Sequence, residues 1–133
     1  MHLRLKSAGQ LRAVLCAATV SLCATALAHG DWPPKHGGLM NEGGETSFEL
    51  VQQRGGLHFY AEDHGTAVPT QGSKAVLTRT RAGSVATFEA KPVGAQELHA
   101  TGASVRPGDK LALKVTFANG SIAVGRFTIP RPD

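Results

Sequence analysis

The sequence predicts an all-β protein, a single antiparallel immunoglobulin-like β-sandwich of about seven short strands that follows an N-terminal signal peptide. After residue 28, short runs of alternating apolar and polar residues recur, and turn-forming Gly, Pro, Asn and Asp residues separate them at regular spacing. No helical period interrupts this pattern. A small open barrel is the alternative architecture. Residues 46–133 are enough for one domain, and no shift in composition marks a second.

The first 28 residues have the features of a secretory signal peptide. Three basic residues, Arg4, Lys6 and Arg12, precede an apolar stretch at 13–22. This stretch is too short to span a bilayer comfortably. Ala26-Leu27-Ala28 is the small-x-small pattern that signal peptidase accepts. We therefore predict cleavage after Ala28. An uncleaved anchor helix and a lipoprotein attached at Cys16 or Cys23 are the alternatives, and the cleavage site favours neither.

Cleavage changes the composition that matters for function. It removes three of the 14 basic residues and leaves 11 against 10 acidic residues, a net charge of +1. This balance, with no aromatics interleaved among Lys and Arg, predicts no nucleic-acid partner, and no membrane contact is expected after cleavage. Both cysteines also leave with the signal peptide, so neither a disulfide nor a thiolate nucleophile is expected. No Gly-x-Ser-x-Gly elbow occurs, and we predict that the protein is not an enzyme.

Residues 29–45 form a segment rich in Gly, Pro and His, and we expect it to be flexible. Trp32-Pro33-Pro34 favours an extended path. Gly37-Gly38 permits a sharp turn or a close backbone approach. A polar turn at 41–45 leads into the first strand.

The next stretch predicts a β-hairpin around which the site is organised. Residues 48–52 and 57–62 are the two strands, and 54–56 are the turn. Leu57, Phe59 and Ala61 alternate with polar neighbours and should face the core. Because a hairpin returns the chain to its starting end, residues 63–64 should lie near the segment that enters the first strand.

Further strands are expected at 66–69, 74–79, 84–90, 97–100, 110–118 and 121–129. Turns are expected between them, at 91–94 and at 106–109 among other places. Asn119-Gly120 is the preferred two-residue hairpin turn, with positive φ at both positions. In the last strand, Phe127 and Ile129 are expected to face the core.

Histidines at the two ends of the predicted hairpin are the candidate metal ligands. The hairpin should bring His64 and its neighbour Asp63 within reach of His36. Imidazole is a common protein ligand for copper and zinc. Met40 could add a thioether, which would favour Cu(I).

His29 becomes the mature N-terminus after the predicted cleavage, where its amino and ring nitrogens together suit Cu(II). That arrangement also leaves open a copper monooxygenase, which ranks below simple binding because only Trp32 and Tyr60 supplement the phenylalanines for a substrate face. His58 and His99 lie on polar strand faces, and we expect both to be exposed.

Five stretches together resemble small periplasmic proteins of heavy-metal resistance systems. They are HGG at 36–38, FELV at 48–51, LHFYAEDHG at 57–65, PVGAQEL at 92–98 and RF at 126–127. The chain is similar also to an extra β-sandwich domain of some periplasmic adaptor subunits of heavy-metal efflux pumps of the resistance-nodulation-division class. The resemblance covers most of residues 36–129, and HGG with DHG is its most specific part.

This resemblance implies a periplasmic protein that binds copper, zinc or a related ion for buffering, tolerance or transfer to an efflux system. His36 and His64 are the ligands it implies, with Asp63 beside the second. A pump adaptor is the implied protein partner. The alternative function is an interaction module that docks onto an efflux or envelope partner and binds no metal.

Overall fold

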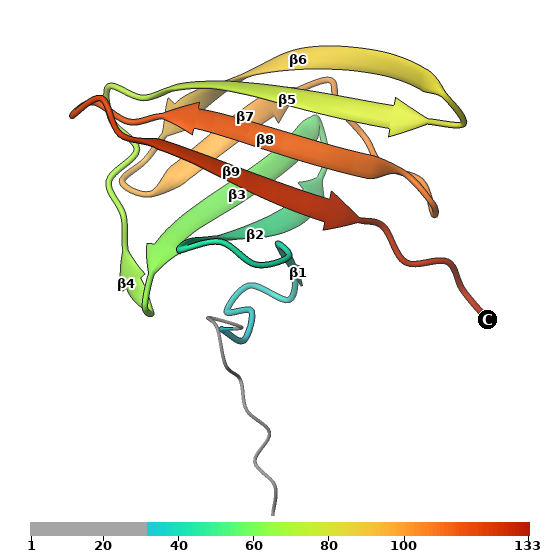
Figure 1. Cartoon of the computed structure of the whole chain (residues 1–133), viewed down its shortest axis with the longest axis horizontal. Helices are drawn as coiled ribbons and strands as arrows, with labels where there is room; N and C mark the ends of the chain where they lie inside the picture. The colour runs from blue at the N-terminus through green and yellow to red at the C-terminus, as the bar shows by residue number, and fades with distance from the viewer. Residues whose placement is uncertain (1–31) are drawn as a thin grey trace, which may run out of the picture.

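The computed structural model describes residues 32–133, so the predicted signal peptide and His29 lie outside the described residues. The described part of the chain has nine strands and no helix, which confirms the all-β prediction (Figure 1). The strands are β1 (Leu39–Met40), β2 (Thr46–Gln53), β3 (Gly56–Asp63), β4 (Thr66–Ala67), β5 (Lys74–Arg81), β6 (Ser84–Val93), β7 (Glu97–Thr101), β8 (Lys110–Thr116) and β9 (Ile122–Thr128). In the described residues, no helix is long and apolar enough to cross a membrane.

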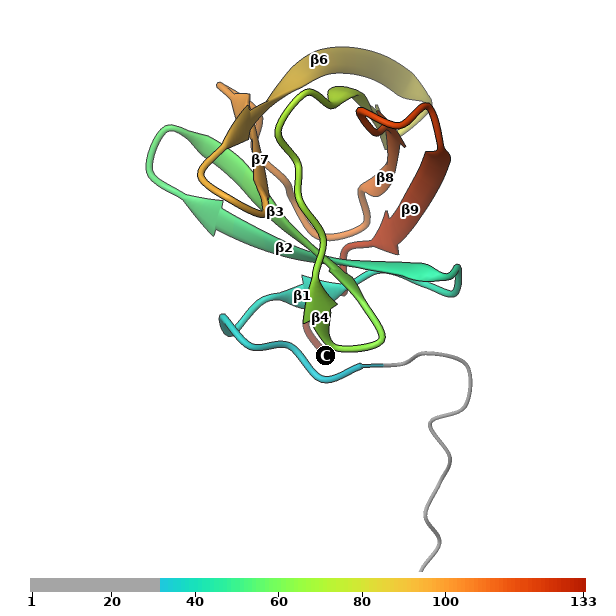
Figure 2. The ribbon, with the colours of Figure 1, turned by 90° about the vertical axis from the view of Figure 1, so that its left-hand side faces the viewer.

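The strands form one antiparallel sheet in the order β1-β2-β3-β7-β6-β5-β8-β9, and β4 pairs with β3. The sheet curls until its ends approach each other, as the view along the barrel shows (Figure 2). The predicted sandwich of about seven strands is therefore imprecise, and a nearly closed barrel describes the architecture better.

The long strand β6 explains why two separate layers do not form. Residues 84–90 pair with β5, whereas residues 91–93 continue the same strand and pair with β7. The turn predicted at 91–94 therefore begins too early. Pro92 lies within the strand opposite Leu98, and the chain turns only at Gly94, whose φ is +69°. Pairing with β7 overrides the local turn preference of this proline and glycine.

Side chains rather than a full hydrogen-bond ladder bring the barrel's ends together. Phe48 of β2 packs against Gly125 of β9, where a Cβ atom would lie 2.7 Å from Phe48 Cδ2. The Glu42 N–H also donates to the Arg126 carbonyl at 2.8 Å. The predicted inward faces are confirmed, because Leu57, Phe59, Ala61 and Phe127 are all buried in the core.

The two hairpin predictions differ in outcome. The central hairpin is confirmed, with Gln53 opposite Gly56 at its end. The β8–β9 loop is longer than the predicted two residues, because β8 ends at Thr116 and β9 begins at Ile122. The Phe117 N–H donates to the Ser121 carbonyl at 2.8 Å across this loop. Gly120 has a φ of +89°, whereas Asn119 has no positive φ and instead accepts hydrogen bonds from Ser121 through its side chain.

An ion pair with a buried carboxylate joins the end of β5 to the residue before β8. Asp109 is 1% exposed, and both of its carboxylate oxygens accept hydrogen bonds from the Arg81 guanidinium, at 2.9 and 2.8 Å. The Arg106 N–H donates to the same carboxylate at 2.8 Å. The Arg81 hydrogen bonds hold the pKa of Asp109 below its ordinary value, although burial opposes them.

Candidate functional site

Strand register gathers the titratable side chains of β2, β3 and β7 on the outer surface of the sheet. Glu49 lies opposite Tyr60, Tyr60 lies opposite Glu97, and His58 lies opposite His99. Because directly paired residues point to the same side, these five side chains share one surface, which we call the histidine face.

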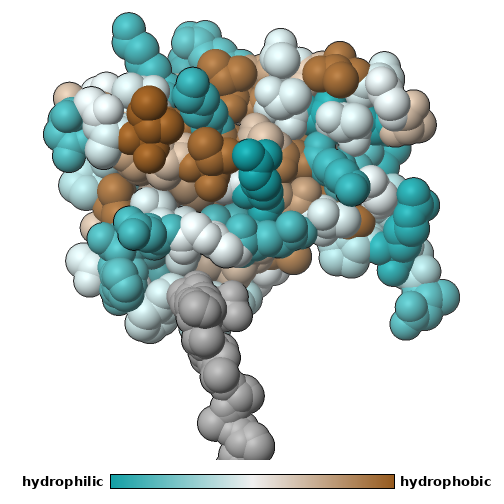
Figure 3. Space-filling model, viewed as in Figure 1, coloured by the Kyte–Doolittle hydropathy of each residue, from teal (hydrophilic) through white to brown (hydrophobic). Residues whose placement is uncertain are grey.

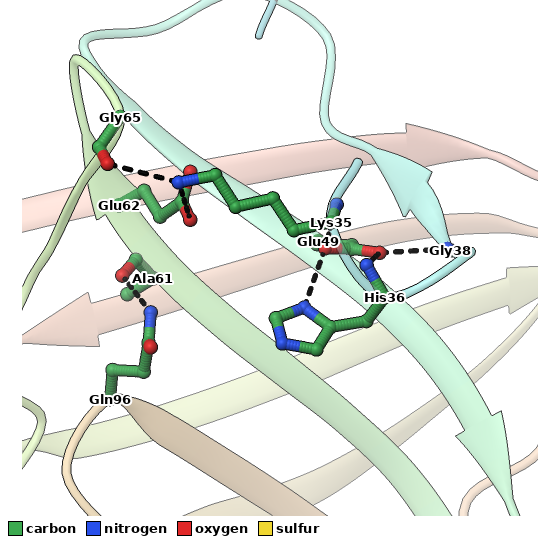
Figure 4. Close-up of polar contacts among 8 residues, drawn as sticks. All are labelled: Lys35, His36, Gly38, Glu49, Ala61, Glu62, Gly65 and Gln96. Atoms are coloured by element: carbon green, nitrogen blue, oxygen red, sulfur yellow. Dashed lines mark hydrogen bonds and ion pairs between the residues drawn. The ribbon is translucent and has the colours of Figure 1, made fainter. Parts of the chain in front are cut away.

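Glu49 ties the segment before β1 to this face (Figure 4). Its carboxylate is buried and accepts the backbone N–H groups of Lys35 at 2.9 Å, His36 at 2.7 Å and Gly38 at 2.7 Å. Burial alone would raise the pKa of Glu49, but these bonds and the contact with the His36 ring hold it below its ordinary value. These hydrogen bonds join residues 35–38 of the Gly-, Pro- and His-rich segment to β2.

Glu49 and Tyr60 fix the orientation of the His36 ring. Its Nδ1 lies 2.9 Å from Glu49 Oε1. The ring also stacks on Tyr60, with a centroid distance of 3.7 Å and an angle of 8° between the planes. When Nδ1 carries the proton shared with Glu49, Nε2 keeps its lone pair and can accept a proton or a metal ion.

Lys35 and Trp32 make the predicted contact between this segment and the end of the hairpin. Lys35 Nζ lies 3.0 Å from Glu62 Oε2 and donates to the Gly65 carbonyl at 3.0 Å. The Trp32 ring meets the His64 ring edge-on, with centroids 6.2 Å apart. The expected convergence of chain segments thus occurs, but His36 does not take part in it.

His64 lies apart from His36. It sits in the turn after β3 with a φ of +52°, its side chain is 77% exposed, and its Nδ1 lies 2.6 Å from Asp63 Oδ1. His36 stacks on Tyr60, whereas His64 follows Asp63, and the strand rise puts about 10 Å between the Cα atoms of Tyr60 and Asp63. Met40 is half-buried and lies opposite Glu49, the residue that contacts the His36 ring.

Within residues 32–133, no group of three or more His, Cys, Asp or Glu side chains is arranged to hold a metal ion. His36 and His64 each place Nδ1 against a carboxylate, that of Glu49 and that of Asp63 respectively.

Sequence reasoning missed the pairing of His58 with His99. Both were expected to be exposed, yet the His58 side chain is only 15% exposed and the two rings stack at 4.2 Å. His58 Nδ1 lies 3.2 Å from Glu97 Oε2, and His99 Nε2 is buried without a partner. Burial lowers the pKa of His99, the nearby His58 acts in the same direction, and Glu97 opposes both. Only the register between β3 and β7 reveals this pair.

Comparison with protein-family models, with curated proteins and with solved structures finds no match to this chain.

Proposed function

We propose that the mature protein is a periplasmic metal-binding protein that buffers copper or zinc, or passes the ion to an efflux system, without chemical turnover. The supporting observation is that His36 and His64 each place Nδ1 against a carboxylate oxygen, at 2.9 and 2.6 Å. Histidines that bind metals generally donate their second ring N–H to a carboxylate, a carbonyl or water. Such a partner fixes the tautomer and makes the free nitrogen more basic.

His36 is the better prepared of the two ligands. Glu49 and Tyr60 hold its ring from two sides, and its side chain is still 36% exposed. A metal ion at Nε2 therefore gains a ligand that is already ordered, which lowers the entropy cost of binding. Met40 opposite Glu49 offers a thioether on the same side of the sheet, and this soft donor favours Cu(I).

His64 is the second proposed ligand and lies at the exposed end of the hairpin. Its neighbour Asp63 accepts a hydrogen bond from a protonated Nδ1, which leaves Nε2 free, and adds a negative charge nearby. Trp32 lies against His64, and only two residues separate Trp32 from His29, so the three Cα–Cα steps between them span at most about 10 Å. If cleavage follows Ala28, the terminal amine and ring of His29 can reach a copper ion held at His64.

Export to the periplasm and service to an efflux system rest on the signal-peptide pattern and on the family resemblance. The resemblance covers the segments that carry His36, Glu49, Tyr60 and His64.

The proposal is tested by isothermal titration of the mature protein, starting at His29, with Cu(II), Cu(I) and Zn(II). The His36→Ala/His64→Ala double variant should lose tight binding. A control, His58→Gln, removes an imidazole from the same face and should bind as the wild type does. Affinity should also fall as the pH is lowered, because protons compete with the metal ion for the imidazole nitrogens.

The single variants distinguish one shared ion from two separate ions. If His64 swings toward His36 to share an ion, either single variant abolishes tight binding. If the sites are separate, each single variant removes one equivalent. Wild-type protein that binds none of the three ions, or a double variant that binds them equally well, would refute the proposal.

A further inference from the structure

The outer surface of β5, β8 and β9 concentrates positive charge. Strand register places Lys74, Lys110, Lys114 and Arg126 on it, all exposed, and no Asp or Glu of these three strands shares it. We call this surface the basic face. Three carboxylates of other segments border it. Glu89 lies on β6 opposite Val76, Glu42 lies in the turn before β2, and Glu45 lines a hollow together with Ile122 and Val124.

A hollow of about 310 Å³ lies at one end of the basic face, where β5 ends and β8 begins. Ala112 forms part of its lining, directly between Thr78 on β5 and Arg126 on β9. Lys110, the hydroxyls of Thr80 and Thr128, and the carboxylate of Glu42 also belong to its polar lining. A small residue in the middle strand, flanked by larger polar ones, creates this depression.

The two cations of the hollow are not neutralised by the protein itself. Among residues 32–133, no carboxylate lies within ion-pair distance of Lys110 or Arg126. Glu42 lines one side of the hollow, but it is not paired with either cation. Two unpaired cations and three hydroxyl groups around one depression suit a carboxylate, which accepts several hydrogen bonds at once.

Apolar side chains on the same face indicate the kind of molecule that carries this carboxylate. Val76, Val124 and Ile122 are 48%, 38% and 60% exposed, and they alternate with the cations across the strands. Figure 3 shows this side of the molecule, with brown apolar patches among teal polar ones. A free inorganic anion has no apolar surface to bury against these side chains. A membrane surface is favoured by Trp, Tyr or long apolar side chains, and these β-branched residues are short.

From these observations we infer that the basic face binds an acidic segment of a partner protein, with one carboxylate seated in the hollow between Lys110 and Arg126. The apolar side chains of the segment cover Val76, Val124 and Ile122. This surface is separate from the histidine face, so the inference stands independently of metal binding.

The test uses a fluorescently labelled ten-residue peptide of alternating Glu and Val, titrated into the mature protein and followed by anisotropy and amide chemical shifts. We expect saturable binding, with shifts confined to β5, β8 and β9. The Lys110→Ala/Arg126→Ala variant should bind about tenfold more weakly. Glu42→Gln removes the carboxylate at the rim and should strengthen binding about threefold.

Matched controls separate this site from general charge attraction. Arg54→Ala/Lys91→Ala removes the same charge from exposed positions outside the basic face and should leave peptide affinity unchanged. A Gln-Val peptide, inorganic phosphate and phosphatidylglycerol vesicles should each bind more weakly than the Glu-Val peptide.

Three results would overturn the inference. They are an unchanged affinity in the Lys110→Ala/Arg126→Ala variant, equal binding of phosphate or of the uncharged peptide, and vesicle binding without peptide binding. Metal titration of the Lys110→Ala/Arg126→Ala variant tests the proposed function separately. The variant keeps His36 and His64, so metal binding should persist whether or not the peptide binds.

Discussion

The Glu49→Gln substitution should release the segment that covers the histidine face. In the wild type, Oε2 accepts the N–H groups of His36 and Gly38, while Oε1 meets the Lys35 N–H and the His36 ring. A carboxamide has one accepting atom, so two of these four donors lose their acceptor. Each N–H donor without an acceptor costs about 1–3 kcal/mol if it stays buried, but the donors of a released segment can bond to water instead. We therefore expect about 2 kcal/mol of lost local stability.

Amide hydrogen exchange measures this change directly. A loss of about 2 kcal/mol corresponds to roughly 30-fold faster exchange at Lys35, His36 and Gly38. Glu89→Gln, an exposed change of equal charge on β6, should leave these rates unaltered. Exchange at the three amides within twofold of the wild type in Glu49→Gln would show that the carboxylate does not hold the segment.

Three further predictions concern stability. Asp109→Asn should lower the free energy of unfolding by about 3–5 kcal/mol in urea titration, because it leaves Arg81 partly buried without its countercharge. Since the folded-state pKa of Asp109 lies below its unfolded value of 3.8, the wild type keeps this stabilisation above that pH and loses it as the pH falls through the folded-state pKa. Gly125→Ala should cost about 1–3 kcal/mol in the same assay, since the new Cβ meets the Phe48 ring, and an unchanged midpoint would mean that the ring moves freely. The folded state disfavours protonated His99, so stability should fall as the pH drops below 6.5, and His99→Phe should flatten this dependence between pH 8 and pH 5.

Local patterns predicted the fold where the structure depends on neighbouring residues. Leu57, Phe59 and Ala61 alternate along one strand, and the chain reverses at Gly55, so the hairpin follows from a short stretch of sequence. Pro92 shows the limit of this approach. Its neighbours read as a turn, but pairing with a strand further along the chain keeps them extended.

The candidate site depends more strongly on contacts between distant residues. The sequence correctly brought the segment before β1 to the end of the hairpin, yet it could not show that Glu49 would capture the His36 ring. His58 and His99 are 41 positions apart, and their stacking follows from a register that no local pattern encodes. The basic face could not be predicted for the same reason, because the pairing of β8 with β9 is what places Lys110 and Arg126 on one surface.

The separation of charge between the cations of the basic face and the carboxylates of the histidine face, Glu49 and Glu97, gives the protein an electric dipole. Net charge sets how strongly a protein drifts in a field, whereas a dipole sets how it turns. An approaching anionic partner would rotate the molecule so that β5, β8 and β9 lead and the histidines trail toward solvent. At physiological ionic strength, salt screens charges over about 8–10 Å. The orientation of the protein during an encounter should therefore depend on ionic strength.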